Sequence, residues 1–186
     1  MVNTYQKMVE EFHQKLGATI GTTPELRESE LRAKLILEEA VETVAAMGFA
    51  AHAGFSAPYD KDEYQPDEIA KFFKMYDKPN FLDTIDGYCD LIYVVLGAAV
   101  TDGIDLDPFF TEVHRANIAK LGGGMREDGK FLKPDGWQPP DHERILIHQQ
   151  NLANLWADLE AEFWAEGEVV NTAEARHERL TNGEAA

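Results

Sequence analysis

The chain has 186 residues, with 34 Asp and Glu against 17 Lys and Arg, and a formal net charge of -17. A surface of this sign repels phosphate backbones, so the composition excludes a nucleic-acid-binding protein. The content of 44% hydrophobic residues is typical of a globular chain. Cys89 is the single cysteine, so the chain can form neither an intrachain disulfide nor a cysteine-based metal site.

The N-terminal stretch has the spacing of an amphipathic helix over residues 3–17, with Gly17 as its stop. It lacks the apolar segment of a secretion signal, and no run in the chain approaches the length of a membrane span. We therefore expect a soluble, cytoplasmic protein without membrane contact. The positions of this first helix that we expect to be buried are Tyr5, Met8, Val9, Phe12 and Leu16.

Residues 31–47, LRAKLILEEAVETVAAM, predict the helix around which the fold is organised. At about 100° per residue, Leu31 and Leu35 fall in the same sector as three glutamates, so the acidic patch interrupts an apolar surface. Carboxylates this close repel one another, and a bound cation would relieve that repulsion. The alternative interpretation is a solvated helix face. The three glutamates are Glu38, Glu39 and Glu42.

Residues 49–81 interrupt the helical pattern with Gly and Pro and are rich in aromatic rings. Helical spacing returns only over residues 66–75. We interpret this insertion either as a lid that stacks on a base or as a satellite cluster that packs on the domain.

Residues 82–102 predict a second long helix, apolar on almost all sides and therefore central and buried. Asp83, Asp86 and Asp90 nevertheless share one stripe of it. Buried carboxylates need partners, and the helix with the three glutamates is the obvious element to face them. We expect Asp86 and Asp90 to bind a metal ion. The alternatives are a helix-capping role for Asp83 and ion pairs with Arg or Lys for the other two.

Asp107 as N-cap and Pro108 at the first helical position predict a third core helix that runs to Gly122. A loop with two Asp-Gly turns follows. The stretch 114–133 has the highest density of basic residues in the chain, as a polyphosphate ligand requires. A solvated hinge is the alternative, and for Arg115 an ion pair with a carboxylate. The basic residues are Arg115, Lys120, Arg126, Lys130 and Lys133.

Beyond Pro140 the composition shifts. Residues 141–165 predict one or two helices, and residues 166–186 a polar, acidic and frayed tail. The expected organisation is a domain at 1–140, with the insertion at 49–81, and a C-terminal helical extension at 141–186. Every expected element is helical.

The order and spacing of these motifs resemble the all-α nucleoside triphosphate pyrophosphohydrolases, which include MazG-like proteins, phosphoribosyl-ATP pyrophosphohydrolase and dimeric dUTPases. Their EExxE motif is present at residues 38–42. Their ExxD motif matches Asp90, but Gly87 stands where the family has Glu. Asp86 is the expected substitute for that Glu, with Asp83 as second choice.

Two further segments, HRANIAK at 114–120 and KPDGW at 133–137, are similar to the branch of MazG-like proteins that cleaves dUTP and other dNTPs. In that branch, residues of the third helix and the basic loop contact the nucleotide. The resemblance thus implies a substrate-binding group that consists of Asn117, Lys120, Arg126, Lys130 and Lys133.

The resemblance also implies a MazG-like four-helix bundle that forms a homodimer or homotetramer. The implied enzyme depends on Mg²⁺, with Mn²⁺ as a substitute, and converts a (d)NTP into the monophosphate and pyrophosphate. Its substrate carries a dUTP-like pyrimidine or a guanine base. A non-catalytic regulatory module that binds metal and nucleotide is the alternative, and an acidic protein with a structural divalent site is the third interpretation. The implied metal ligands are Glu38, Glu39, Glu42, Asp86 and Asp90.

Glu39 is also the expected general base. It is rotated by about 100° from Glu38 on the helix, so it can reach past a metal ion to a bound water molecule. A further metal ligand is the alternative role for this residue.

Overall fold

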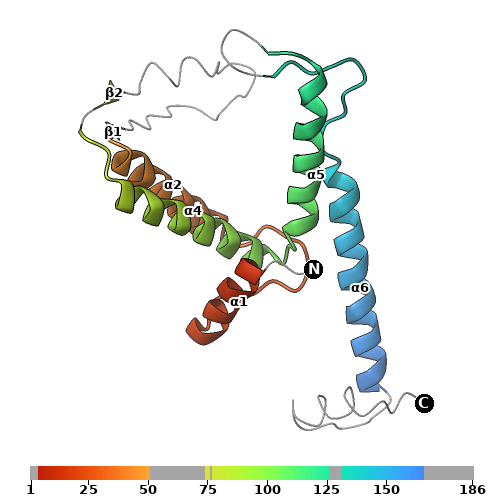
Figure 1. Cartoon of the computed structure of the whole chain (residues 1–186). Helices are drawn as coiled ribbons and strands as arrows, with labels where there is room; N and C mark the ends of the chain where they lie inside the picture. Colours follow the sequence, from red (N-terminus) through yellow and green to blue (C-terminus); the bar gives the residue numbers. More distant parts are fainter. Residues whose placement is uncertain (1–3, 51–73, 76, 126–130, 166–186) are drawn as a thin grey trace.

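The computed structural model describes residues 4–50, 74–75, 77–125 and 131–165 (Figure 1). These residues form helices, one short 3₁₀ turn and one pair of two-residue strands, so the chain has an all-α fold. The elements are α1 (Thr4–Leu16), α2 (Ser29–Ala46), β1 (Phe49–Ala50), β2 (Lys74–Met75), α4 (Phe81–Asp102), α5 (Asp107–Ile118), η1 (Ala119–Gly122) and α6 (His142–Ala165).

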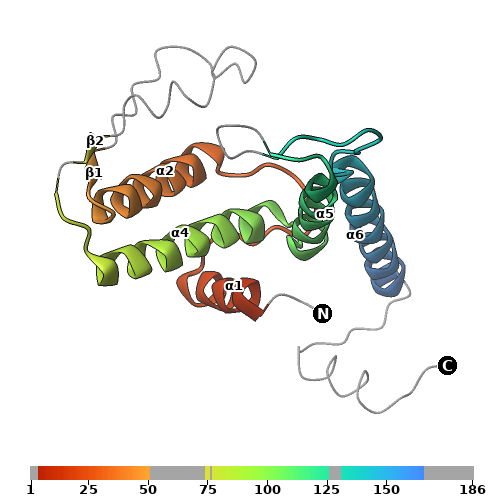
Figure 2. The same ribbon diagram turned by 45° about the horizontal axis from the view of Figure 1, so that its top comes forward.

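Helices α2 and α4 lie side by side and share the most extensive contact between elements (Figure 2). Two glycines of α4 show that the helices run antiparallel. Gly87 faces Thr43, and Gly97 faces Arg32, so numbers rise along one helix as they fall along the other. The three glutamates of α2 and Asp90 of α4 lie between these two contacts.

Helix α1 packs on the C-terminal half of α4 and forms the small hydrophobic core with it. Val9 meets Leu96 and Val100 there, and Ile20 and Leu106 cover them. The expected burial of α1 is correct for Val9 and wrong for the other four positions, because this helix contacts the chain along one narrow strip. The four side chains are 47–68% exposed and belong to Tyr5, Met8, Phe12 and Leu16.

Helix α4 is central, as expected, but most of its buried residues lie in its C-terminal half, and only Thr84 and Gly87 are buried nearer its start. The N-terminal half lies beyond α1, and Phe81 and Leu82 are 74% and 76% exposed. Further along, Ile85, Tyr88 and Ile92 are also exposed. The expectation of a helix buried along its whole length is therefore wrong for one chain, and its N-terminal half presents an apolar surface.

By length and composition alone, α4 is long and apolar enough to cross a membrane, with 22 residues and a mean hydropathy of 1.3. The expectation that no segment approaches that length is wrong. Core helices of soluble proteins meet the same criteria. The three aspartates along one stripe of α4, and its packing against α1 and α2, agree with a helix that packs against protein.

The strands β1 and β2 form an antiparallel pair in which Phe49 lies opposite Met75 and Ala50 opposite Lys74. The expectation that every element is helical is wrong here, because backbone pairing with a distant segment replaces the local helical pattern. The expected helical stretch 66–75 ends in this strand, and its residues 66–73 lie outside the described part. Most of the insertion at 49–81 lies outside it too, so both interpretations of that segment stay predictions.

Helix α5 starts one residue earlier than expected: Asp107 is its first residue, and Leu106 takes the cap position without a side-chain hydrogen bond. The carboxylate of Asp105 instead accepts the backbone N–H of Asp107 (3.1 Å). Helix α6 is a single continuous helix that contacts α5 near its own start, where Ile145 is 7% exposed. The expected four-helix bundle stays a prediction, since α1 and α2 pack on α4 whereas α6 packs on α5.

Candidate functional site

Glu39 is half-buried on α2, the helix that packs against α4. Its pKa is raised above the ordinary value, first by burial and then by the negative charge of Asp90. The remaining contributors, in order of size, are Glu42, Glu38 and Asp86. Glu39 thus feels the negative charge of the other four residues expected to bind a metal ion, and the binding of a metal by these five stays a prediction.

The chemistry of this carboxylate cluster, defined as Glu38, Glu39, Glu42, Asp86 and Asp90, suits a hard divalent cation. Mg²⁺ prefers oxygen ligands, and its charge would offset the repulsion that raises the pKa of Glu39. Across the described ranges, no three His, Cys, Asp or Glu side chains converge closely enough to hold a metal ion. The donor atoms of the cluster suit Mg²⁺ by type and charge, but their positions in the described residues do not form a metal site.

Asp83 and Asp86 have different surroundings, although both lie on the same stripe of α4. Asp83 accepts a hydrogen bond from the amide nitrogen of Asn80 (2.6 Å). The amide oxygen of Asn80 in turn accepts the backbone N–H groups of Leu82 and Asp83 at 3.1 and 3.4 Å. Asp83 is thus part of the helix cap and is absent from the groups that raise the pKa of Glu39, whereas Asp86 is among them.

Gly87, which replaces the Glu of the ExxD motif, lies against Thr43 of α2. A Cβ atom at position 87 would be 2.6 Å from the hydroxyl oxygen of Thr43 and 3.0 Å from its Cα. The Thr43 hydroxyl is itself held by a hydrogen bond that it donates to the carbonyl oxygen of Glu39 (2.6 Å). No side chain fits at position 87 in this packing. The sequence offered only the missing Glu as a signal, and Thr43 was not expected to take part.

The expected substrate-binding residues form a second group around the end of α5. The ammonium group of Lys120 donates to the side-chain oxygen of Asn117 (2.7 Å). Lys133 and Lys120 both lie over the ring of Trp137, with Nζ 4.3 and 5.5 Å from the ring centroid. The Lys–Trp group is therefore Asn117, Lys120, Lys133 and Trp137. Trp137 was not among the expected site residues, and the KPDGW segment that contains it was the only sequence signal. The other two expected residues, Arg126 and Lys130, lie outside the described part.

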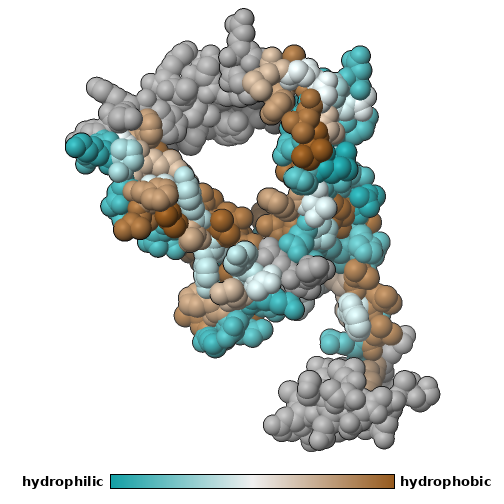
Figure 3. Space-filling view, viewed as in Figure 1, coloured by the Kyte–Doolittle hydropathy of each residue, from teal (hydrophilic) through white to brown (hydrophobic). Residues whose placement is uncertain are grey.

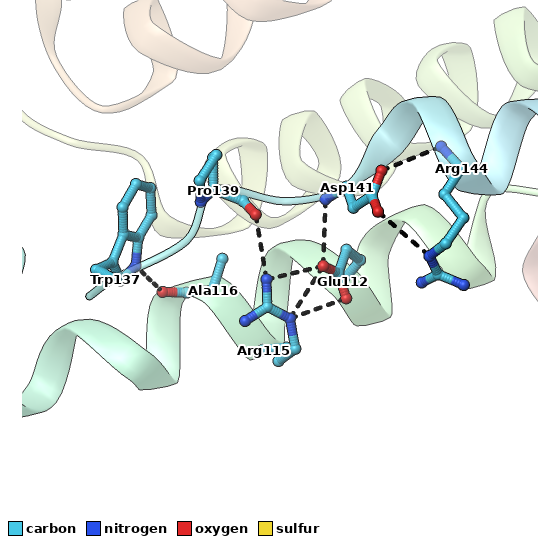
Figure 4. A network of polar contacts seen from close by, with 7 residues as sticks. All are labelled: Glu112, Arg115, Ala116, Trp137, Pro139, Asp141 and Arg144. Atoms are coloured by element: carbon cyan, nitrogen blue, oxygen red, sulfur yellow. Dashed lines mark hydrogen bonds and ion pairs between the residues drawn. The ribbon is translucent and has the colours of Figure 1, made fainter.

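A network of polar contacts fixes the segment after Trp137 onto α5 (Figure 4). Arg115 pairs with Glu112 (2.8 Å) and also donates to the carbonyl oxygen of Pro139 (3.2 Å). The backbone N–H of Asp141 donates to the same Glu112 carboxylate (3.2 Å). These two donors, Arg115 first, lower the pKa of Glu112 to about 2. The alternative interpretation of Arg115 as an ion-pair partner is confirmed.

Within one chain the carboxylate cluster and the Lys–Trp group belong to different parts of the fold. In Figure 1 the C-terminal end of α5 lies well away from α2 and α4. Figure 3 shows an opening between the surface over α2 and α4 and the surface over α5. The sequence spacing did not predict this separation, since it assigned both groups to one site.

The comparisons with known proteins agree with the motifs. The model of the family described as phosphoribosyl-ATP pyrophosphohydrolase matches residues 9–117. The match includes α2, α4 and most of α5, and hence the whole carboxylate cluster. No curated protein matches the chain.

Proposed function

The chain belongs to the phosphoribosyl-ATP pyrophosphohydrolase family, whose members hydrolyse nucleotide pyrophosphate bonds, and we propose that it converts a (deoxy)nucleoside triphosphate into its monophosphate and pyrophosphate with Mg²⁺. The observation that carries this proposal is the carboxylate cluster around Glu39. Of these five acidic side chains only Glu39 is half-buried and the other four are exposed, so the expected burial of Asp86 and Asp90 is wrong. A cation would still relieve their mutual repulsion.

Four members of the cluster are the proposed metal ligands. Glu38 and Glu42 are one helical turn apart on α2, and Asp86 and Asp90 are one turn apart on α4. When bound, Mg²⁺ supplies positive charge to the phosphate oxygens and to the attacking water. Asp86 is the proposed substitute for the motif carboxylate that Gly87 lacks, because the side chain of Asp83 is hydrogen-bonded to Asn80 in the helix cap.

Glu39 is the proposed general base. Its half-buried position and the surrounding negative charge raise its affinity for a proton, as a base near neutral pH requires. In the proposed reaction, Glu39 accepts a proton from water as the water oxygen bonds to the α-phosphorus. The bond from that phosphorus to the bridging oxygen of the β-phosphate breaks, and its electron pair leaves with pyrophosphate.

Positive charge for the phosphates comes from the basic residues at the end of α5 and in the loop that follows. Lys120 and Lys133 are the described members, and the proposal includes Arg126 and Lys130. A protein with a net charge of -17 repels a free triphosphate, so local cations are needed to hold it. Asn117, which is bonded to Lys120, is the proposed contact to the nucleoside part. The proposed substrate carries a dUTP-like pyrimidine or a guanine base.

A homodimer or homotetramer is the proposed assembly. The apolar side chains along α1 and the first half of α4 are exposed in one chain, and the second half of α6 is exposed at Leu155 and Trp156. Such surfaces are costly in water and favour association with another copy. The Lys–Trp group and the carboxylate cluster are far apart within one chain. Association could bring the Lys–Trp group of one copy close to the carboxylate cluster of another.

The test is a turnover screen with all common NTPs and dNTPs, including dUTP, that measures pyrophosphate release with and without Mg²⁺. We expect release from one or a few nucleotides, with the monophosphate as second product and loss of release in Glu38→Gln or Asp90→Asn. Nucleotide binding without release from any substrate would overturn the proposal in favour of a regulatory module. Calorimetry with a non-hydrolysable triphosphate that detects no binding would leave only a structural divalent site.

A further inference from the structure

We propose that Trp137 is a positioning residue, whose indole ring holds the ammonium groups of Lys120 and Lys133 together as one binding point for the polyphosphate of the substrate. The identity of the anion rests on the proposed function. The role of Trp137 rests on contacts within the chain, which involve neither a metal ion nor a nucleotide.

The ring of Trp137 is fixed in place. Its indole N–H donates to the carbonyl oxygen of Ala116 on α5 (2.8 Å), which satisfies the only polar atom of the side chain. The next few residues are tied to the same helix through Pro139 and Asp141, which bond to Arg115 and Glu112 (Figure 4). Trp137 is half-buried, and three hydrogen bonds between residues 137–141 and α5 set its position relative to that helix.

Two lysine ammonium groups lie over this ring. The Nζ atoms of Lys133 and Lys120 lie 4.3 and 5.5 Å from its centroid, both within the range of about 6 Å in which a ring attracts a cation. An aromatic ring attracts ammonium groups through its quadrupole and carries no net charge. Both lysines are thus oriented by Trp137 and keep their full positive charge.

Neither lysine forms an ion pair in the part of the chain that the structure covers, as is also true of Lys7 and Lys78. Six other basic residues there pair with a nearby carboxylate: Lys15, Arg27, Arg32, Lys34, Arg115 and Arg144. Lys120 instead donates to the neutral side chain of Asn117. Two oriented ammonium groups without a carboxylate form a site suited to an anion with several charges, such as a polyphosphate.

The first experiment measures the binding of inorganic tripolyphosphate with Mg²⁺ by calorimetry. Trp137→Leu removes the ring face, Trp137→Phe keeps a smaller one, and Phe110→Leu is the control at an exposed aromatic residue of α5. We expect the affinity to fall roughly 5- to 30-fold for Trp137→Leu, from the loss of two cation–π contacts, and less for Trp137→Phe. The control should bind as the wild type does. Equal affinities of Trp137→Leu and wild type, with Lys120→Ala weakened, would overturn the inference.

The second experiment uses the fluorescence of Trp137 itself. The chain has three tryptophans, so the double variant with Trp156→Phe and Trp164→Phe leaves Trp137 as the only emitter. Tripolyphosphate should change the emission, because the anion places negative charge beside the two ammonium groups that lie over the ring. A purely structural tryptophan would show no such change, and an unchanged spectrum at saturating anion would contradict the proposed role.

Enzyme kinetics separate this inference from the proposed function. If the function is correct, Trp137→Leu should raise KM for the nucleotide more than it lowers kcat, since the lysines bind the phosphates before and during the reaction. Turnover with an unchanged KM in Trp137→Leu would overturn the inference and leave the function intact. If Trp137→Leu weakens tripolyphosphate binding but the protein hydrolyses no nucleotide, the inference on Trp137 stands and the proposed function is wrong.

Discussion

Gly87 of α4 packs so closely against Thr43 of α2 that a Cβ atom at position 87 would lie 2.6 Å from the Thr43 hydroxyl oxygen and 3.0 Å from the Thr43 Cα. Any side chain at position 87 must therefore push the two helices apart. The contact lies between Asp86 and the glutamates of α2, so it sets how closely the two halves of the carboxylate cluster approach each other.

Gly87→Ala should lower the free energy of unfolding by about 1–3 kcal/mol, the usual cost of an extra methyl group in a packed contact. This cost exceeds the gain of about 0.5–1 kcal/mol that alanine brings to a helix. Urea denaturation measures the change. Gly122→Ala is the control, because a Cβ at position 122 meets no atom within 4 Å. A Gly87→Ala protein as stable as the wild type would contradict this account of the contact.

Glu39→Gln should lower the turnover rate roughly 10²–10⁴-fold and leave the affinities for Mg²⁺ and nucleotide nearly unchanged, as loss of a general base predicts. Single-turnover kinetics and calorimetry measure the two quantities. A rate close to that of the wild type would exclude Glu39 as the base.

The same variant has an expected effect on stability. The pKa of Glu39 is raised in the folded protein, so in the absence of metal its ionisation lowers stability as the pH rises from the ordinary glutamate value through the raised pKa. Glu39→Gln removes this loss. The variant should therefore be more stable than the wild type at neutral pH, and the difference should vanish below about pH 4.

Asp86→Asn should weaken metal binding, so that raising the Mg²⁺ concentration partly restores the rate. Asp83→Asn is the matched control on the same stripe of α4. Its side chain bonds to Asn80 in the helix cap, so the Mg²⁺ dependence should stay as in the wild type. Titration of Mg²⁺ against rate compares the two. If both variants depended on Mg²⁺ in the same way, the assignment of Asp86 as a metal ligand and of Asp83 as a capping residue would have no support.

Glu112→Gln should destabilise the protein at neutral pH and not in strong acid. The pKa of Glu112 is lowered to about 2, mainly by Arg115, so its ionised form stabilises the fold above the ordinary glutamate pKa. This contribution is lost as the pH falls through about 2. The stabilities of variant and wild type should therefore converge between about pH 4.5 and pH 2. Denaturation at several pH values tests this, and a constant difference would contradict it.

Sedimentation at micromolar concentration should show a dimer or tetramer of the 20.9 kDa chain. Phe81→Asp combined with Leu82→Asp should shift the distribution toward the monomer, because both side chains are more than 70% exposed on the apolar half of α4. A monomeric wild type would show that these surfaces stay in contact with water.

The helices were predictable from the sequence because their patterns are local. Gly17 and Gly48 adopt positive φ angles at the ends of α1 and α2, as helix-ending glycines do. Burial was less predictable, since it depends on which other helices are present. The apolar residues of α1 have the same spacing whether other helices cover one side of α1 or two. Within a single chain, Val9 is the residue of α1 that reaches the hydrophobic core.

The site was predictable where its residues share a helix face and not where it depends on contacts between distant segments. Helical angles alone placed Glu38 and Glu42 together. The approach of Gly87 to Thr43 depends on how two helices pack, which no local pattern contains. The contact of Trp137 with Lys120 and Lys133 depends on a loop that returns to α5, and sequence spacing does not describe that return.

The pairing of β1 with β2 has a consequence for how this family can change over time. Phe49 and Met75 are neighbours across the strand pair, so the chain leaves and re-enters the domain at one point. The length and composition of the sequence between them can therefore vary without moving α2 relative to α4, since closing a longer loop costs little more than closing a short one. The segment between the two strands can therefore be exchanged as a unit, in evolution or by protein engineering, while the carboxylate cluster keeps its position.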